Sequence, residues 1–177
     1  MTHVALLERA VAYTLGCLRP VTPAALSHPT PCHDWDLRDL LEHLTDSLTA
    51  LREAAEDGHV RLAPTAGSPH DPIATTRDQA RRALGAWTTQ DGREVSIGGC
   101  PLTTDIVARA GALEVAVHGW DVARACRTPR PIPRALADEL YPLALLLVSD
   151  ADRPVRFAAP VTPDTPADRL LAYLGRR

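Results

Sequence analysis

Two residue types are missing from this sequence: it contains no lysine and no asparagine, so all 19 basic residues are arginines. Both missing types have AT-rich codons, and their absence indicates a GC-rich genome rather than a particular chemistry. The formal net charge is -3 and the sequence pI is about 6.1, and no basic block interrupts this weakly acidic composition. Nucleic-acid-binding domains usually carry a concentrated basic surface. The composition therefore argues against a nucleic-acid partner.

Long apolar runs are also missing. No stretch approaches the roughly 18 consecutive apolar residues that identify a transmembrane helix. The N-terminal segment MTHVALLERAVAYTLG places Glu8 and Arg9 inside its apolar pattern. A signal peptide has instead an uninterrupted apolar segment after a basic start. We expect a cytoplasmic protein without a membrane partner.

Cysteine is scarce and scattered, and no CxxC spacing occurs among Cys17, Cys32, Cys100 and Cys126. This spacing argues against a zinc knuckle, and a reducing cytoplasm argues against a disulfide framework. We expect most of these cysteines to be buried small apolar residues. Only Cys32 has neighbours, His33 and Asp34, that would favour a reactive thiolate or an acid/base pair. Plain turn chemistry is the commoner role of such residues in a Pro-rich loop.

The composition that remains is that of an ordinary globular protein, with 45% hydrophobic and 23% charged residues. A chain of 177 residues is long enough for one well-buried core and short for two. We therefore expect a single domain over residues 1–177.

Apolar residues at spacings of three and four predict a mainly helical protein. The predicted long helices are residues 3–18, 37–57, 71–87 and 102–126. Pro20 ends the first, Asp36 is a plausible N-cap for the second, and Asp71-Pro72 begins the third.

The segments between and after these helices are shorter or less regular. The sequence predicts a structured loop at 20–36 with a helical turn at 23–26, a loop at 58–70, a short extended segment or hairpin at 90–101, a helix at 133–149 buried on most sides, an extended piece at 155–158 and a last helical turn or two at 167–174.

The last of the four long helices carries a pair of residues with metal-ligand spacing. Its apolar stripe is Leu102, Ile106, Ala110, Leu113, Val117 and Trp120. Glu114 and His118 lie beside this stripe and, four residues apart, share one face. His43 lies on the flank of the stripe in helix 37–57, where a bundle presents a groove.

Two imidazoles and one carboxylate would leave a fourth coordination position open, as in a catalytic zinc site. The same set also suits Fe(II), Ni(II) or Mn(II), so the ligands do not identify the metal. The simpler alternative is that each of these side chains is a hydrogen-bonded residue at the rim of the core.

Three longer stretches carry a family resemblance over nearly the whole chain. They are PTPCHDWDLRDLLEHL (29–44), EVAVHGWDVARA (114–125) and FAAPVTPDTPADRLLAYLGR (157–176). In order and separation they resemble the signature stretches of actinobacterial proteins related to mycothiol-dependent maleylpyruvate isomerase, within the DinB-like superfamily. The resemblance implies that His43, Glu114 and His118 bind a divalent metal, usually zinc. It also implies a four-helix bundle at about 3–126 with a small C-terminal extension at about 127–177.

The resemblance implies a function with alternatives. Some relatives use the metal to lower the pKa of a low-molecular-weight thiol, mycothiol or bacillithiol, which then attacks a small electrophile in isomerisation or S-transfer. Two other functions stay open: a metal-stabilised protein that binds a small molecule without catalysis, and a biosynthetic enzyme whose metal is a Lewis acid on a carbonyl without external thiol. A homodimer would be common for a bundle of this size.

Five further residues are secondary candidates. Asp121 follows His118 within one turn and would orient its imidazole, or else lie on a solvated turn. Trp35 and Trp120 are either packing residues or walls of the pocket. Arg81, or its neighbour Arg82, would clamp a substrate carboxylate if helix 71–87 lined the groove, although arginine clusters are usually solvated.

Overall fold

A computed structural model of the chain describes residues 3–61, 71–89, 94–153, 157–165 and 168–177. The chain divides into two compact units, Met1–Arg130 and Pro131–Arg177. The boundary lies close to the expected junction between bundle and C-terminal extension. That the two units act as one domain stays a prediction.

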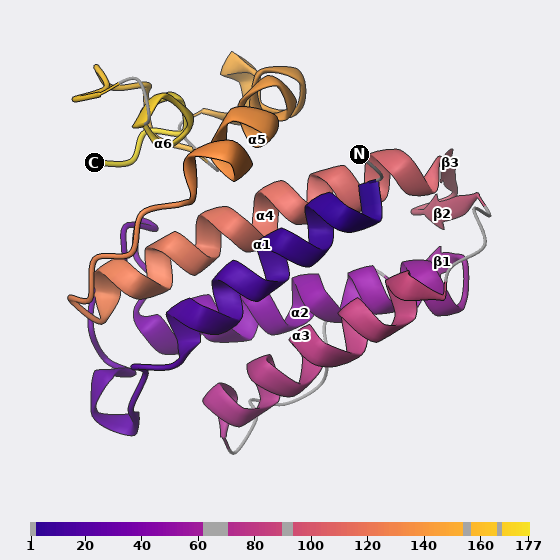
Figure 1. The fold of residues 1–177 in the computed structure, drawn as a ribbon, viewed down its shortest axis with the longest axis horizontal. Helices are drawn as coiled ribbons and strands as arrows, with labels where there is room; N and C mark the ends of the chain where they lie inside the picture. The colour runs from indigo at the N-terminus through magenta and orange to yellow at the C-terminus, as the bar shows by residue number, and fades with distance from the viewer. Residues whose placement is uncertain (1–2, 62–70, 90–93, 154–156, 166–167) are drawn as a thin grey trace. The chain divides into compact units, whose positions relative to one another are not determined.

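The first unit contains four long helices: α1 (His3–Leu18), α2 (Leu37–Glu56), α3 (Pro72–Thr88) and α4 (Thr104–Ala125). Figure 1 shows α1 alongside α4 and α2 alongside α3. Residue contacts also join α1 to α3 and α2 to α4, so that each helix packs against two others around a common core. The mainly helical fold expected from the sequence is therefore confirmed.

Capping residues determine where these helices begin. The Asp36 side chain accepts a hydrogen bond from the Asp39 backbone N–H, and the Asp39 side chain accepts one from the Asp36 backbone N–H, which completes a capping box before α2. Asp71 caps α3, and Thr103 caps α4. The predicted start of the last long helix is wrong by two residues because the preceding residues form a strand.

A small sheet occupies one end of this unit. Strand β1 (His59–Val60) pairs in parallel with β2 (Val95–Ile97), and β2 pairs antiparallel with β3 (Cys100–Leu102). The hairpin predicted at 90–101 is thus confirmed for its described part. The loop predicted at 58–70 is wrong at its start, where β1 forms; residues 62–70, and 90–93 before the hairpin, lie outside the described part of the chain.

Helix α4 is buried on more sides than its predicted stripe suggested. Ile106 on that stripe is 47% exposed, whereas Ala112 and Val115, off the stripe, are fully buried. The physical reason is that α4 packs against α1 on one side and α2 on the other. An apolar stripe along one face is expected for a helix that packs against one neighbour, whereas α4 packs against two.

The second unit contains α5 (Arg134–Leu147), a 3-10 turn at Asp150–Asp152 and α6 (Arg169–Tyr173). The prediction that helix 133–149 is buried on most sides is wrong: Leu145, Leu146 and Leu147 are exposed, and Leu146 is 80% exposed. Only one face of α5, through Leu140 and Ala144, is buried. The predicted final helical turns are confirmed by α6, whereas residues 155–156 of the extended piece predicted at 155–158 lie outside the described part of the chain.

None of the helices among the described residues combines the length and apolar character needed to cross a membrane.

Candidate metal centre

The side chains of His43, Glu114 and His118 meet between α2 and α4. His43 Nε2 lies 2.7 Å from Glu114 Oε1, and His118 Nε2 lies 3.2 Å from the same oxygen. The three ligand atoms all lie within 4.8 Å of one another. The sequence predicted this proximity; a role of the three residues as metal ligands stays a proposal.

The spacing of these atoms fits a divalent metal ion. Ligand atoms at about 2.0–2.1 Å from a tetrahedral zinc lie about 3.4 Å apart. The measured separations of 2.7 and 3.2 Å from Glu114 Oε1 are close to this value. An ion would need small side-chain movements that replace hydrogen bonds by coordination. The donor set, two imidazole nitrogens and one carboxylate oxygen, is one that zinc, iron and nickel accept.

The charges of the three residues are coupled. Burial by itself raises the pKa of Glu114, but the charge of His118 and the hydrogen bonds from His118 and His43 outweigh it and hold that pKa well below its usual value. Burial likewise lowers the pKa of His118, but the Glu114 carboxylate and the hydrogen bonds to Asp121, Cys32 and Glu114 raise it well above its usual value. Metal binding by these residues would therefore be accompanied by the release of protons.

Asp121 lies on the other side of the His118 ring. Its Oδ2 is 3.0 Å from His118 Nδ1, and Asp121 is fully buried. An ionised carboxylate only accepts hydrogen bonds. An ionised Asp121 therefore requires a proton on His118 Nδ1, which donates a hydrogen bond to Oδ2. This leaves Nε2, which faces Glu114, as the nitrogen with a lone pair in the neutral ring. A carboxylate at this position is typical of metal-binding histidines.

Cys32 extends the same network from the loop before α2. Its thiol donates to Asp121 Oδ2 at 3.4 Å, and its sulfur lies 3.8 Å from His118 Nδ1. His33 and Asp34, the neighbours considered for Cys32, instead pair with each other at 2.7 Å and face solvent. The expectation that most cysteines are buried is also wrong, since only Cys17 is, while Cys100 is exposed.

The loop 29–36 is closed on itself and covers the cluster. Its ends, Pro29 and Asp36, form an isolated bridge, and the Trp35 backbone N–H donates to the Cys32 carbonyl at 3.2 Å. Asp34 accommodates the tight reversal with a φ of 64°, in the left-handed region. Hydrogen bonds also tie the segment before the loop to both helices, from Leu37 N to His28 O and between His28 Nδ1 and Ala125 O.

Trp35 from this loop walls the cluster. The centre of its ring lies 4.8 Å from that of His43 and 6.4 Å from that of His118. Its side chain remains partly exposed, at 36%. Trp35 therefore lies beside both imidazoles, and its role as a wall of a pocket stays a prediction.

Two residues near the cluster were not predicted. Ser47 donates its hydroxyl to Glu114 Oε1 at 3.2 Å. It follows His43 by one helical turn on α2, so the same spacing rule that joined Glu114 to His118 would have identified it.

Gly119 allows α1 to approach α4, because a Cβ there would lie 2.4 Å from Thr14 Oγ1. Thr14 donates to the Val115 carbonyl at 2.7 Å and holds this part of α4 in place.

The remaining candidates do not join the cluster in the described contacts. Trp120 is buried, with the Arg124 guanidinium 5.5 Å from its ring centre. Arg81 is exposed on α3, and Arg82 pairs with Asp78 on the same helix at 2.7 Å. A substrate clamp at Arg81 therefore stays a prediction without geometric support.

Comparison with known proteins finds relatives of this chain in sequence and in fold. Two uncharacterized proteins of Mycobacterium tuberculosis, from strains CDC 1551 / Oshkosh and ATCC 25618 / H37Rv, are each 27% identical over 96% of this chain and 94% of their own length. A crystal structure of the mycothiol-dependent maleylpyruvate isomerase aligns with a TM-score of 0.56 and 16% identity, over 78% of this chain. The chain spans 66% of that protein's length, and at this identity the likeness shows the fold alone.

A sequence model of one family matches residues 7–123, which include all four long helices in whole or in large part and every residue of the cluster. This is well over half of the chain, and the match ends before the second unit. The chain therefore belongs to the family described as the mycothiol maleylpyruvate isomerase N-terminal domain.

Proposed function

We propose that this protein is a divalent-metal-dependent enzyme that activates a low-molecular-weight thiol of the mycothiol type and transfers or isomerises a small electrophile. The observation that carries the proposal is the meeting of His43 Nε2, Glu114 Oε1 and His118 Nε2 within 4.8 Å, in a chain of this family. Zinc is the metal we expect, and nickel, iron and manganese are compatible with the same ligands.

Each residue of the cluster has a defined part in this proposal. His43, Glu114 and His118 would hold the ion, and Asp121 would keep His118 in the tautomer that offers Nε2. A bound zinc-type ion supplies one chemical effect, the deprotonation of a coordinated thiol near neutral pH. Ser47 would stay hydrogen-bonded to Glu114 and fix its carboxylate. Trp35 would shield the thiol sulfur from bulk water.

The exposure of the cluster favours a catalytic rather than a structural metal. The side chains of His43 and Glu114 are 37% and 36% exposed, while His118 is 10% exposed. Three protein ligands would leave a coordination position for a small molecule, and the exposure of His43 and Glu114 supports its approach from solvent on their side. A structural zinc would be closed by a fourth protein ligand.

The proposal is tested first by metal content and thiol binding. We expect one divalent ion per chain in carefully purified protein, and sulfur scattering at the metal in X-ray absorption spectra after addition of mycothiol. Metal well below one equivalent would contradict the proposal. An ion that never gains a sulfur ligand would support instead a non-catalytic protein or a metal that acts without thiol.

Activity is tested second, with maleylpyruvate as the first electrophile because the solved relative is named for it. His43→Ala, Glu114→Ala and His118→Ala are each expected to abolish thiol-dependent turnover and metal binding together. Asp105→Asn is the matched control, since Asp105 lies on the same helix in an exposed ion pair with Arg109. Turnover that survives loss of the metal would contradict the proposal.

A further inference from the structure

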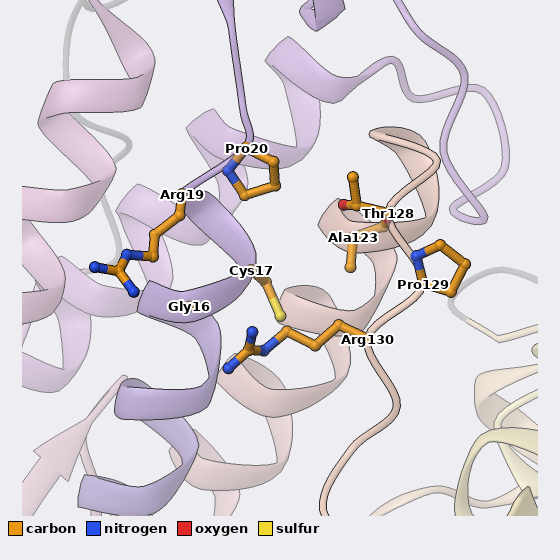
Figure 2. Close-up of a pocket in the computed structure, with 8 residues that line it drawn as sticks. All are labelled: Gly16, Cys17, Arg19, Pro20, Ala123, Thr128, Pro129 and Arg130. Atoms are coloured by element: carbon orange, nitrogen blue, oxygen red, sulfur yellow. The ribbon is translucent and has the colours of Figure 1, made fainter.

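A cavity away from the metal cluster lies in the first unit, and none of the cluster residues lines it. Its volume is about 470 Å³, within the range of small-molecule sites, and it lies where the last turn of α1 meets the end of α4. Figure 2 shows the side chain of Arg130 reaching from the segment after α4 toward Gly16 on α1. Arg19, directly after α1, also borders the cavity, but its side chain points away from Arg130 (Figure 2).

The walls of this cavity are firmly held. Arg127 has a φ of 54°, and the Thr128 backbone N–H donates to the Ala123 carbonyl at 3.0 Å, so the chain reverses at the end of α4. The Tyr13 hydroxyl then donates to the Arg130 carbonyl at 2.6 Å and fastens the returning segment to α1. The cavity is therefore formed before any ligand arrives.

The Arg130 guanidinium is positioned by packing rather than by an acid. It lies 6.0 Å from the centre of the Tyr13 ring. A Cβ on Gly16 would be only 2.7 Å from Arg130 Nη2, so the group lies directly against the glycine. Among the described residues no carboxylate pairs with Arg130 or with Arg19, and none of the lining residues is acidic. The Arg130 guanidinium thus lines the cavity with unused hydrogen-bond donors.

The rest of the lining is largely apolar. Pro20, Ala123, Pro129 and Cys17 contribute to it. Burial raises the pKa of the Cys17 thiol to about 11, so at neutral pH this side chain is an uncharged, weakly polar group. A bare phosphate would leave these surfaces without contact, whereas an organic acid would place its carbon skeleton against them. The planar guanidinium fork matches a carboxylate.

We infer that this cavity binds a small organic carboxylate, with the carboxylate on Arg130 and the carbon skeleton against the prolines and Ala123. The site is separate from the proposed metal centre, and the inference does not depend on the proposed function. Metal content and carboxylate binding can therefore fail independently.

The test is a titration of the full-length protein with benzoate, acetate and inorganic phosphate, followed by NMR of the arginine Nε–Hε groups. Benzoate is expected to shift the Arg130 signal and to bind more tightly than acetate or phosphate. The shift should persist after treatment with a chelator, which separates this cavity from the metal. Phosphate that binds as tightly as benzoate, or benzoate that leaves the Arg130 signal in place, would overturn the inference.

Two variants test whether the effect of removing a positive charge depends on its position in the cavity. Arg130→Gln is expected to weaken benzoate binding by about 10- to 100-fold, the usual effect of one charge-assisted hydrogen-bonding group. Arg38→Gln makes the same charge change at an exposed position of α2 outside the lining and should leave affinity unchanged. Equal losses in both variants would refute a local site.

Gly16→Ala keeps every charge and places a methyl group where the Arg130 guanidinium lies. It is expected to weaken benzoate binding by about tenfold while the thermal midpoint stays equal or rises, because alanine favours the helix. Since the neighbour that must move is the end of a flexible side chain, the fold should tolerate the change. Unchanged affinity in Gly16→Ala would show that the position of Arg130 against the helix is irrelevant and would contradict the inference.

Discussion

Replacing Asp121 tests whether the buried network behind His118 prepares the metal site. Asp121 is fully buried, its Oδ2 is 3.0 Å from His118 Nδ1, and the same oxygen accepts the Cys32 thiol at 3.4 Å. Asp121→Asn keeps an acceptor of the same shape and removes the charge. Asp121→Ala removes the acceptor of the His118 Nδ1–H and of the Cys32 thiol.

Loss of such a carboxylate typically lowers metal affinity by about 10- to 100-fold, or ~1.4–2.7 kcal/mol of binding free energy. We expect Asp121→Asn near the lower end, because the amide oxygen can still accept from Nδ1. Asp121→Ala should lie near the upper end, because the imidazole is then free to rotate or to change tautomer. The predicted order of zinc affinity is wild type, then the asparagine variant, then the alanine variant.

The assay is competition for zinc against a chromophoric chelator at one fixed pH, since apparent affinity depends on the protons that the ligands release. Asp105→Asn, which alters an exposed carboxylate on the same helix, is the control and should bind zinc like the wild type. Unfolding of the metal-free variants in urea shows whether any lost affinity reflects a damaged fold. Wild-type affinity in folded Asp121→Ala would refute the reasoning.

Two further predictions concern stability. Gly119→Ala should lower the free energy of unfolding by about 1–3 kcal/mol in urea titrations, because its methyl group would meet Thr14 Oγ1 at 2.4 Å and Thr14 Cα at 3.1 Å. Gly85→Ala, with nothing within 4 Å of the new methyl group, should instead stabilise α3 by about 0.5–1 kcal/mol, and equal effects at both glycines would contradict the packing argument. Burial raises the pKa of Glu53, but hydrogen bonds from the Arg61 backbone and guanidinium outweigh it and lower that pKa below its usual value. The stabilising contribution of Glu53 is therefore present above the unfolded pKa of about 4.3 and lost as pH falls, so the stability difference between wild type and Glu53→Gln should shrink from pH 7 to pH 3. A difference that is constant with pH would show that Glu53 is not the charged partner.

Local chemistry made much of the fold predictable. The caps at Asp36 and Asp71 mark helix starts because a side-chain oxygen there satisfies backbone N–H groups that no other helix residue can reach. The position of His43, Glu114 and His118 beside their stripes also followed from helical geometry. Their meeting could be expected because the flanks of neighbouring helices face each other, and the family resemblance identified which flanks.

Features that depend on several neighbours were not predictable in the same way. Burial around most of α4 follows from its contacts with two helices, which a single sequence window does not contain. The Leu145–Leu147 run is exposed, although its hydrophobicity predicted burial, because hydrophobicity alone does not show which apolar side chains pack against another element. The contact of Cys32 with Asp121 joins residues 89 positions apart through a closed loop, whereas the sequence showed only His33 and Asp34 beside the cysteine.

The loop 29–36 is, in mechanical terms, a spacer of fixed length between α2 and α4. Backbone bonds attach it to the start of α2, and His28 attaches the preceding residues to the carbonyl of Ala125 near the end of α4. We therefore expect the number of residues in the loop to affect the separation between His43 and Glu114. Removing one residue from this turn would then change the opening available to an ion, although the three proposed ligands, and the helices that carry them, would be unaltered.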